Sequence, residues 1–109
     1  LVELPTEPTL DDFSWFYFSY ADEATITCSY PVDYVYDIWK DNFDELANEG
    51  DKIFVLKLHP QLIGRSSRVR MRERFIAYMK ANGAWLASCE DVARYVKEFY
   101  AKRAEGGEA

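Results

Sequence analysis

The stretch KIFVLKL, residues 52–58, constrains the fold of this chain more than any other feature. It is dense enough in apolar residues to be a strand buried on both faces. Such strands are typical of parallel sheets that helices cover on each side. Two shorter segments, LVEL at 1–4 and AWLAS at 84–88, are further strand candidates.

A helical pattern follows each of these strand candidates. From Pro31 to Gly50, apolar residues recur at helical spacing, with the proline suited to a first turn and the glycine to the position past the end. A second helix over about 66–82 begins with a serine cap and is ended by a glycine. A third helix follows Ser88, which forms a capping-box pattern with Asp91.

The alternation of strand and helix predicts an α/β fold with a parallel sheet and right-handed crossovers. A complete eightfold (β/α) barrel takes about 250 residues, so three strand-helix units would take about 94. The chain has 109 residues. We therefore expect three consecutive strand-helix units over 1–103, forming the C-terminal part of a distorted (β/α) barrel, and a disordered tail over 104–109. A small doubly wound sheet is the competing architecture, although it usually has more strands.

The composition limits the partners. The net charge of −6 argues against nucleic acid or an anionic membrane, because both need a basic face. No apolar run approaches the roughly 18 residues of a membrane span. The chain begins at Leu1 rather than Met, so we expect a further part upstream. Cys28 and Cys89 lack a CxxC spacing, and we interpret them as buried thiols, with a disulfide as the alternative. Free thiols favour a reducing, cytoplasmic compartment.

His59 is the only histidine in the chain and stands at the end of the predicted strand 52–58. Asp11 and Asp12 follow the first strand candidate, so parallel strands would bring them to the same rim as His59. A carboxylate bonded to one ring nitrogen fixes the tautomer and prepares the other nitrogen for proton transfer. The alternative is a structural histidine with no catalytic role.

Three strings carry a resemblance to a known family: LPTEPTLDDF at 4–13, LHPQLIGRSSRVRM at 58–71 and AWLASCEDVARYV at 84–96. Together they resemble the polysaccharide deacetylase (NodB-homology) family, in its peptidoglycan-deacetylase-like and allantoinase-like branch. The resemblance covers nearly the whole chain but only the C-terminal part of that family's domain. The His-Pro-x-x-Ile-Gly-Arg string is its most specific element.

The resemblance implies a hydrolase that cleaves C–N bonds with a divalent metal. In that family, two histidines and an aspartate hold the metal, and another aspartate acts as the base. These groups belong to the N-terminal part, so we expect the metal, zinc by preference, to be bound outside this chain. His59 matches the histidine that protonates the departing amine, and Asp11 or Asp12 matches the carboxylate that orients it. A lone histidine also suits this role better than a zinc site, which takes about three protein ligands.

Two further residues are candidates for substrate binding. Arg65 lies in the matched string, where it can contact a substrate anion or anchor a loop. It also opens a run of arginines, which we interpret as a solvated helix face, with an anion or nucleic-acid patch as the alternative: Arg65, Arg68, Arg70, Arg72 and Arg74. Trp15 lies in the aromatic segment FSWFYFSY, which can stack on sugar rings or, alternatively, pack in a core or interface.

The leading hypothesis is the C-terminal part of a metal-dependent, deacetylase-like amidohydrolase that is active only with its N-terminal part. That part would be a second chain or a further segment, so we expect an oligomer or a larger protein. N-acetylated sugars, peptidoglycan, ureides and cyclic imides are all compatible substrates. The rival hypothesis is a small, non-catalytic α/β interaction or regulatory module.

Overall fold

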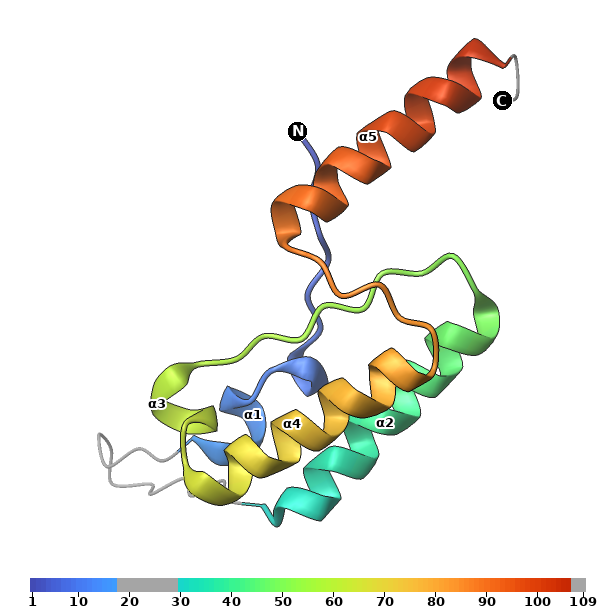
Figure 1. Cartoon of the computed structure of the whole chain (residues 1–109). Helices are drawn as coiled ribbons and strands as arrows, with labels where there is room; N and C mark the ends of the chain where they lie inside the picture. The colour runs from blue at the N-terminus through green and yellow to red at the C-terminus, as the bar shows by residue number, and fades with distance from the viewer. Residues whose placement is uncertain (18–29, 107–109) are drawn as a thin grey trace. The chain divides into compact units, whose positions relative to one another are not determined.

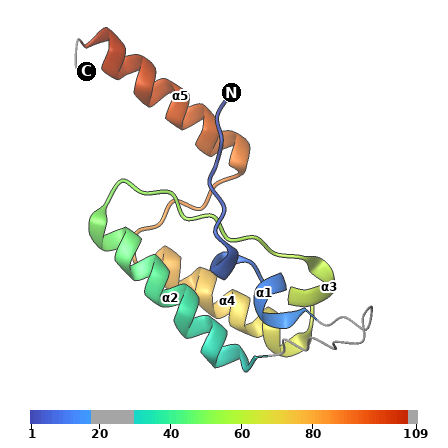
Figure 2. The ribbon, with the colours of Figure 1, turned by 180° about the vertical axis from the view of Figure 1, so that it is seen from behind.

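The computed structural model describes residues 1–17 and 30–106. The chain divides into two compact units, Thr6–Ala84 and Leu1–Pro5 with Trp85–Ala109. The larger unit holds η1 (Pro8–Leu10), α1 (Phe13–Phe16), α2 (Val32–Glu49), α3 (Pro60–Ile63) and α4 (Ser66–Ala81). Within it, α2 and α4 lie side by side and run in the same direction (Figures 1 and 2). The N-terminal ends of both helices therefore lie at the same end of the unit, near α1 and α3.

The core of the larger unit lies between α2 and α4. Val35, Trp39 and Phe43 line one face of α2 at helical spacing. Phe75 of α4 packs against them, with its ring centroid 6.2 Å from Trp39 and 6.3 Å from Phe43. The remaining buried apolar residues are Leu10, Phe16, Tyr36, Ile63, Met71 and Met79. The core is thus a helix-on-helix interface that shorter segments cover at one end.

The predicted helices are confirmed. Pro31 is the N-cap of α2, and Gly50 follows the helix with φ 75°, a conformation that favours glycine. The helix α4 begins at Ser66 and ends at Ala81, but the predicted serine cap is wrong, because Arg65 is the N-cap and no side chain caps the helix. In the smaller unit, α5 (Cys89–Glu105) begins after Ser88, whose hydroxyl accepts a hydrogen bond from the Asp91 backbone N–H at 3.1 Å.

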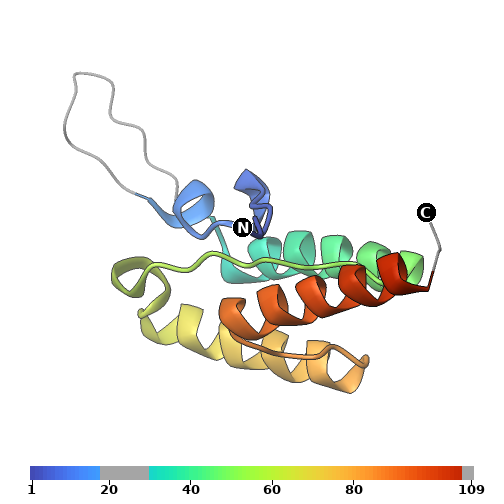
Figure 3. The same ribbon diagram turned by 90° about the horizontal axis from the view of Figure 1, so that it is seen from above.

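The predicted α/β fold class is wrong, because the described residues contain no strand and no sheet. Residues 51–59 form an extended segment that returns along the α2–α4 pair (Figure 3). Alternate residues Phe54, Leu56 and Leu58 pack against the core, as expected for extended chain. Between the extended segments of the described part, the one bridge pairs Asp11 with Lys57.

The fold class was predicted wrongly because the apolar run 52–58 is buried against helices and not between strands of a sheet. A strand needs a hydrogen-bonded neighbour along its length, and here the single bridge provides only one point of contact. The other strand candidates, 1–4 and 84–88, also form no strand. The run at 52–58 is apolar because one face of it packs on α2 and α4. In the predicted parallel sheet, helices would have buried it on both faces. The described part of the chain is therefore a small helical protein and no segment of a (β/α) barrel.

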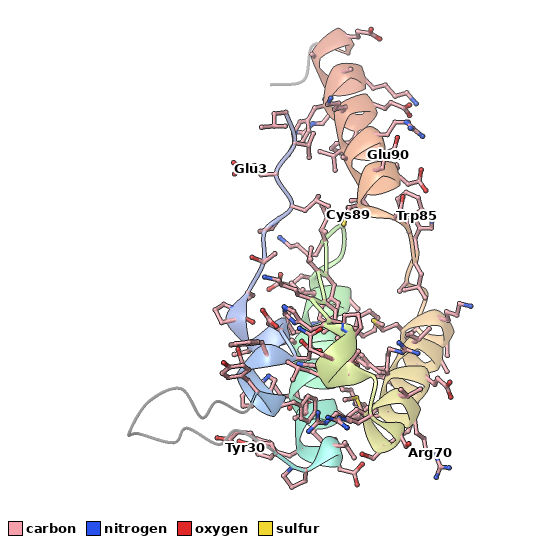
Figure 4. The ribbon with its side chains drawn as sticks, turned by 90° about the vertical axis from the view of Figure 1, so that its left-hand side faces the viewer. Glu3, Tyr30, Arg70, Trp85, Cys89 and Glu90 are labelled. Atoms are coloured by element: carbon pink, nitrogen blue, oxygen red, sulfur yellow. The ribbon has the colours of Figure 1, made fainter. Side chains whose placement is uncertain are left out.

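The smaller unit consists of an extended N-terminal segment and α5. Val92 and Val96 of α5 are half-buried, whereas Tyr95 is exposed. Cys89, at the first turn of α5 (Figure 4), is a free and exposed thiol, so the prediction that it is buried is wrong. Cys28 lies outside the described residues. The predicted tail boundary at 104 falls within the last turn of α5, and 107–109 are not described.

Among the described residues, no helix combines the length and the apolar composition of a segment that crosses a bilayer.

Candidate functional site

The structure brings Asp11, Asp12 and His59 together in the larger unit. Two backbone hydrogen bonds join their segments, one from Lys57 N–H to the Leu10 carbonyl at 2.9 Å and one from Asp12 N–H to the Lys57 carbonyl at 3.1 Å. This pairing sets the end of η1 beside residue 59. His59 is then the N-cap of α3, with Pro60 at the first helical position.

Asp12 holds His59 with both carboxylate oxygens. Oδ2 accepts a hydrogen bond from the His59 backbone N–H at 2.8 Å, and Oδ1 lies 2.6 Å from the ring Nδ1. The Asp12 side chain is completely buried, while the His59 side chain is 27% exposed. Because an ionised carboxylate can only accept, the ring proton of this pair belongs to Nδ1. The opposite nitrogen, Nε2, is therefore the one left for exchange with a ligand.

Asp11 takes a different part in the cluster. Its Oδ1 accepts a hydrogen bond from the Phe13 backbone N–H at 2.9 Å and lies 3.5 Å from His59 Nδ1. Its Oδ2 is 3.8 Å from the Lys57 ammonium nitrogen. Asp11 thus caps the short helix α1 and contributes charge near His59. Of the two aspartates left open by the sequence, Asp12 is the one whose geometry orients the imidazole.

The same three residues are the candidate metal ligands of this chain. One ligand atom from each lies within 4.8 Å of the others. Asp12 Oδ2 already accepts from the His59 backbone N–H and Oδ1 is paired with the ring Nδ1, so an ion held by these atoms would have to break the pair. A catalytic zinc takes about three protein ligands with free lone pairs. The donor set does not fit a divalent metal, and the site is a hydrogen-bonded acid–histidine pair.

A pocket of about 630 Å³ lies near His59, although His59 is not one of its lining residues. Phe13 is the wall common to both, because it lines the pocket and its ring centroid lies 5.7 Å from that of the imidazole. The pocket is lined by Phe13, Phe16, Tyr17, Gln61, Leu62, Arg65, Ser67 and Arg68. Arg65, a predicted substrate-binding residue, lines this pocket, and Phe13 is the residue that links the pocket to His59.

Arg68 is a further charged residue of the pocket, which the sequence placed in the arginine run but not among the predicted site residues. Its Nη1 donates to the Leu62 carbonyl at 2.9 Å, and its guanidinium lies 4.3 Å from the centroid of the Phe16 ring. Burial lowers the pKa of Arg68, and the nearby charge of Arg65 lowers it further. The spacing of three residues between Arg65 and Arg68 could have identified the pair, because residues three apart lie on the same face of a helix.

Trp15 is not among the residues that line this pocket. Its indole N–H donates to the Thr9 carbonyl at 2.9 Å, and its ring packs edge-on against Tyr30 and Tyr34. Trp39 donates to the same carbonyl at 2.8 Å, so the two indoles fix η1 over the core. A role of Trp15 in sugar binding stays a prediction, and residues 18–20 of the aromatic segment lie outside the described part.

Comparison of the chain with protein-family models, curated proteins and solved structures finds no match.

Proposed function

We propose that His59 is the proton donor of a hydrolase that cleaves non-peptide C–N bonds, of the polysaccharide deacetylase type. One observation carries this proposal. A completely buried carboxylate, Asp12, holds the imidazole through Nδ1 and leaves Nε2 unbonded to Asp12, in a side chain that is 27% exposed. A histidine held in this way is suited to general acid catalysis, because its tautomer and orientation are set before the substrate binds.

The chemistry assigned to His59 is a single proton transfer. Water adds to the acyl carbon through its oxygen and gives a proton to a base, which the family resemblance implies lies outside this chain; the C–N bond then breaks and its electron pair goes to nitrogen. The imidazolium gives its Nε2 proton to that nitrogen, so the amine leaves as a neutral group. The Nδ1 proton stays on the ring and remains hydrogen-bonded to Asp12. The negative charge of Asp12 stabilises the imidazolium before the transfer.

The divalent metal implied by the motifs, zinc by preference, would activate the attacking water. Because Asp11, Asp12 and His59 do not fit a metal, we propose that its ligands lie outside this chain, in a partner chain or a further segment. Exposed apolar side chains of the smaller unit support a partner, since contiguous apolar surface is typical of interaction sites. They are Trp85, Leu86, Tyr95, Phe99 and Tyr100.

A non-catalytic module is the second candidate, and one observation favours it. The Asp12–His59 bonds lie next to the bridge between Asp11 and Lys57. Together these contacts fasten η1 to the segment before α3. In that case the Asp12–His59 pair only stabilises the fold, and the Nε2 atom of His59 has no catalytic role.

Replacing His59 by Gln separates the two functions. The assay uses the chain together with the partner chain or further segment that supplies the metal ligands, adds Zn²⁺, and follows acetate release from N-acetylglucosamine oligomers, and amine or ammonia release from a ureide and a cyclic imide. If His59 is the acid, H59Q lowers kcat by about 10²- to 10⁴-fold. Lys80→Gln, an exposed change in α4, is the control. Turnover by H59Q at the wild-type rate would exclude the acid role.

A further inference from the structure

We propose that the pocket near His59 binds an oxyanion of the substrate through Arg65 and Arg68. For the reaction, this inference rests on the proposed function. It narrows the substrate from N-acylated compounds in general to those that carry a carboxylate or phosphate group near the scissile C–N bond.

The first support is the pairing of charges in the described part of the chain. Arg74 pairs with Asp33, and Arg94 with Glu90 and Asp91. Neither Arg65 nor Arg68 forms a salt bridge with a carboxylate of the described residues. Arg70, Arg72 and Arg103 form none either, so Arg65 and Arg68 are distinguished by lining this pocket together. Asp12 acts on Arg68 only at longer range, and its oxygens are already bonded to His59.

The second support is the fixed position of Arg68. Its bond to the Leu62 carbonyl uses one guanidinium nitrogen, and the Phe16 ring supports its face. The remaining donors of the planar group are thereby ordered at the pocket wall, as bidentate recognition of an oxyanion requires. Burial and the neighbouring Arg65 both disfavour the charge of this guanidinium. A bound anion would offset both effects.

The third support is the composition of the pocket. Gln61 and Ser67 add neutral polar groups to the lining, while Phe13 and Tyr17 form a stacked aromatic pair with ring centroids 3.9 Å apart. A volume of about 630 Å³ lies in the range of small-molecule sites. The polar and cationic groups would hold the anion, and the aromatic pair would hold the part of the substrate next to His59.

The negative net charge of the protein argues against non-specific binding of anions. At −6 the chain repels anions on average, so affinity for a small oxyanion has to come from a local site. Both carboxylate and phosphate match the guanidinium fork. The experiment therefore uses both as probes.

The binding experiment titrates the ¹⁵N-labelled chain with inorganic phosphate and, separately, with acetate. Shifts are expected at the Arg65, Ser67 and Arg68 amides and at the Arg68 side-chain Nε–H. Arg65→Gln and Arg68→Gln should each weaken binding at least about tenfold, as loss of a charge-assisted bond would. Arg65 is exposed, so R65Q tests the site even if R68Q unfolds the protein. Lys80→Gln removes the same charge about 18 Å along α4 from Arg68 and should change nothing. No shift at these amides, or equal weakening by K80Q, would overturn the proposal.

A turnover experiment distinguishes this inference from the proposed function. N-acetylmuramic acid and N-acetylglucosamine 6-phosphate are compared with uncharged N-acetylglucosamine. The anionic compounds should have a kcat/KM at least about tenfold higher, and R65Q should remove that preference. If H59Q abolishes turnover but charged and neutral compounds react alike, the anion site is wrong and the proton donor stands. If H59Q is active while R65Q still loses phosphate binding, the proposed function fails and the anion site stands.

Discussion

The Asp12 carboxylate contacts His59 at two points, the backbone N–H at 2.8 Å and the ring Nδ1 at 2.6 Å. Two bonds from one buried group fix both the position of the residue and the rotation of its ring. The backbone bond also satisfies the N–H of the α3 N-cap, which would otherwise be unpaired near the core. The start of α3 and the orientation and tautomer of the His59 ring thus depend on the same side chain, that of Asp12.

Asp12→Asn should reverse the tautomer of His59. The amide oxygen can still accept from the backbone N–H, but its NH₂ group must then face Nδ1 and donate to it, so the ring proton moves to Nε2. Because the chain has one histidine, a ¹⁵N-correlated spectrum of the imidazole reports this change without ambiguity. We expect the Nδ1 resonance to change from a protonated to an unprotonated nitrogen, and unfolding to become easier by about 1–3 kcal/mol.

Asp11→Asn is the matched control for this spectrum. Asp11 lies 3.5 Å from Nδ1 and bonds elsewhere, to the Phe13 backbone N–H. The variant should therefore leave the tautomer as it is. A tautomer that changes in D11N and persists in D12N would contradict the assignment of Asp12 as the orienting group.

The proximity of Asp11 and Asp12 to His59 could be expected from the sequence, although for a different reason. Sequence reasoning expected a common rim of a parallel sheet, whereas the structure joins the segments by a single bridge at Asp11 and Lys57. The expectation succeeded because both arrangements need an extended segment that ends at residue 59. The choice between the two aspartates required coordinates, since burial and distance distinguish Asp12 from Asp11.

The helices were predictable and the sheet was not, for a physical reason. Helical periodicity and capping are local, so the pattern of Val35, Trp39 and Phe43 was enough to locate α2. A strand depends on neighbours that are distant in sequence. The apolar run 52–58 has the composition of a buried strand, yet one face of it packs on helices and only Lys57 is bridged. Composition alone does not distinguish these two cases.

Gly64→Ala should disrupt the turn between α3 and α4. A methyl group at this position would overlap the Pro60 carbonyl oxygen, which is backbone and cannot rotate away. The same oxygen accepts the Gly64 N–H at 3.0 Å, so relief of the overlap would lengthen that bond. We expect a loss of about 1–3 kcal/mol in the free energy of unfolding, measured by urea denaturation.

Gly83→Ala is the control that separates steric overlap, expected at Gly64, from backbone strain. Gly83 has open space around its Cα but a φ of 83°, so its alanine variant is strained through the backbone alone. Only G64A should also shift the amide resonances of His59 and Arg65, which flank its turn. Wild-type resonances for both residues in G64A would show that the turn tolerates a side chain.

The stability contributed by the Lys40–Asp44–Tyr78 cluster should depend on pH. The Asp44 carboxylate accepts hydrogen bonds from Lys40 at 2.9 Å and from the Tyr78 hydroxyl, and it thereby joins α2 to α4. The bond from Lys40, followed by that from Tyr78, lowers the pKa of Asp44. The bond to Asp44, followed by burial, raises the pKa of Tyr78. Both shifts favour a charged carboxylate beside a neutral phenol.

The sign of each shift determines the pH range. A lowered Asp44 pKa contributes stability above about pH 4, which is lost as the pH falls through the lowered value. A raised Tyr78 pKa contributes stability below about pH 10, which is lost as the pH rises through the raised value. Tyr78→Phe should therefore melt below wild type at neutral pH, and the difference in Tm should shrink at both extremes. A difference that stays constant from pH 3 to pH 11 would contradict this account.

Phe75→Ala should be the most destabilising of the changes considered, because Phe75 is completely buried. Its ring packs against four other aromatic rings, those of Tyr36, Trp39, Phe43 and Phe54, with centroids 5.7, 6.2, 6.3 and 6.0 Å away. Removing the ring leaves a cavity between α2 and α4 and removes the contact of α4 with Phe54 in the extended segment. Truncation of a buried phenylalanine costs about 3–5 kcal/mol, which is a large part of the stability of a small domain. Phe99→Ala is the control, since that ring is 46% exposed and should cost far less. Equal losses in the two variants, measured by urea denaturation, would show that the α2–α4 interface is not the core of this protein.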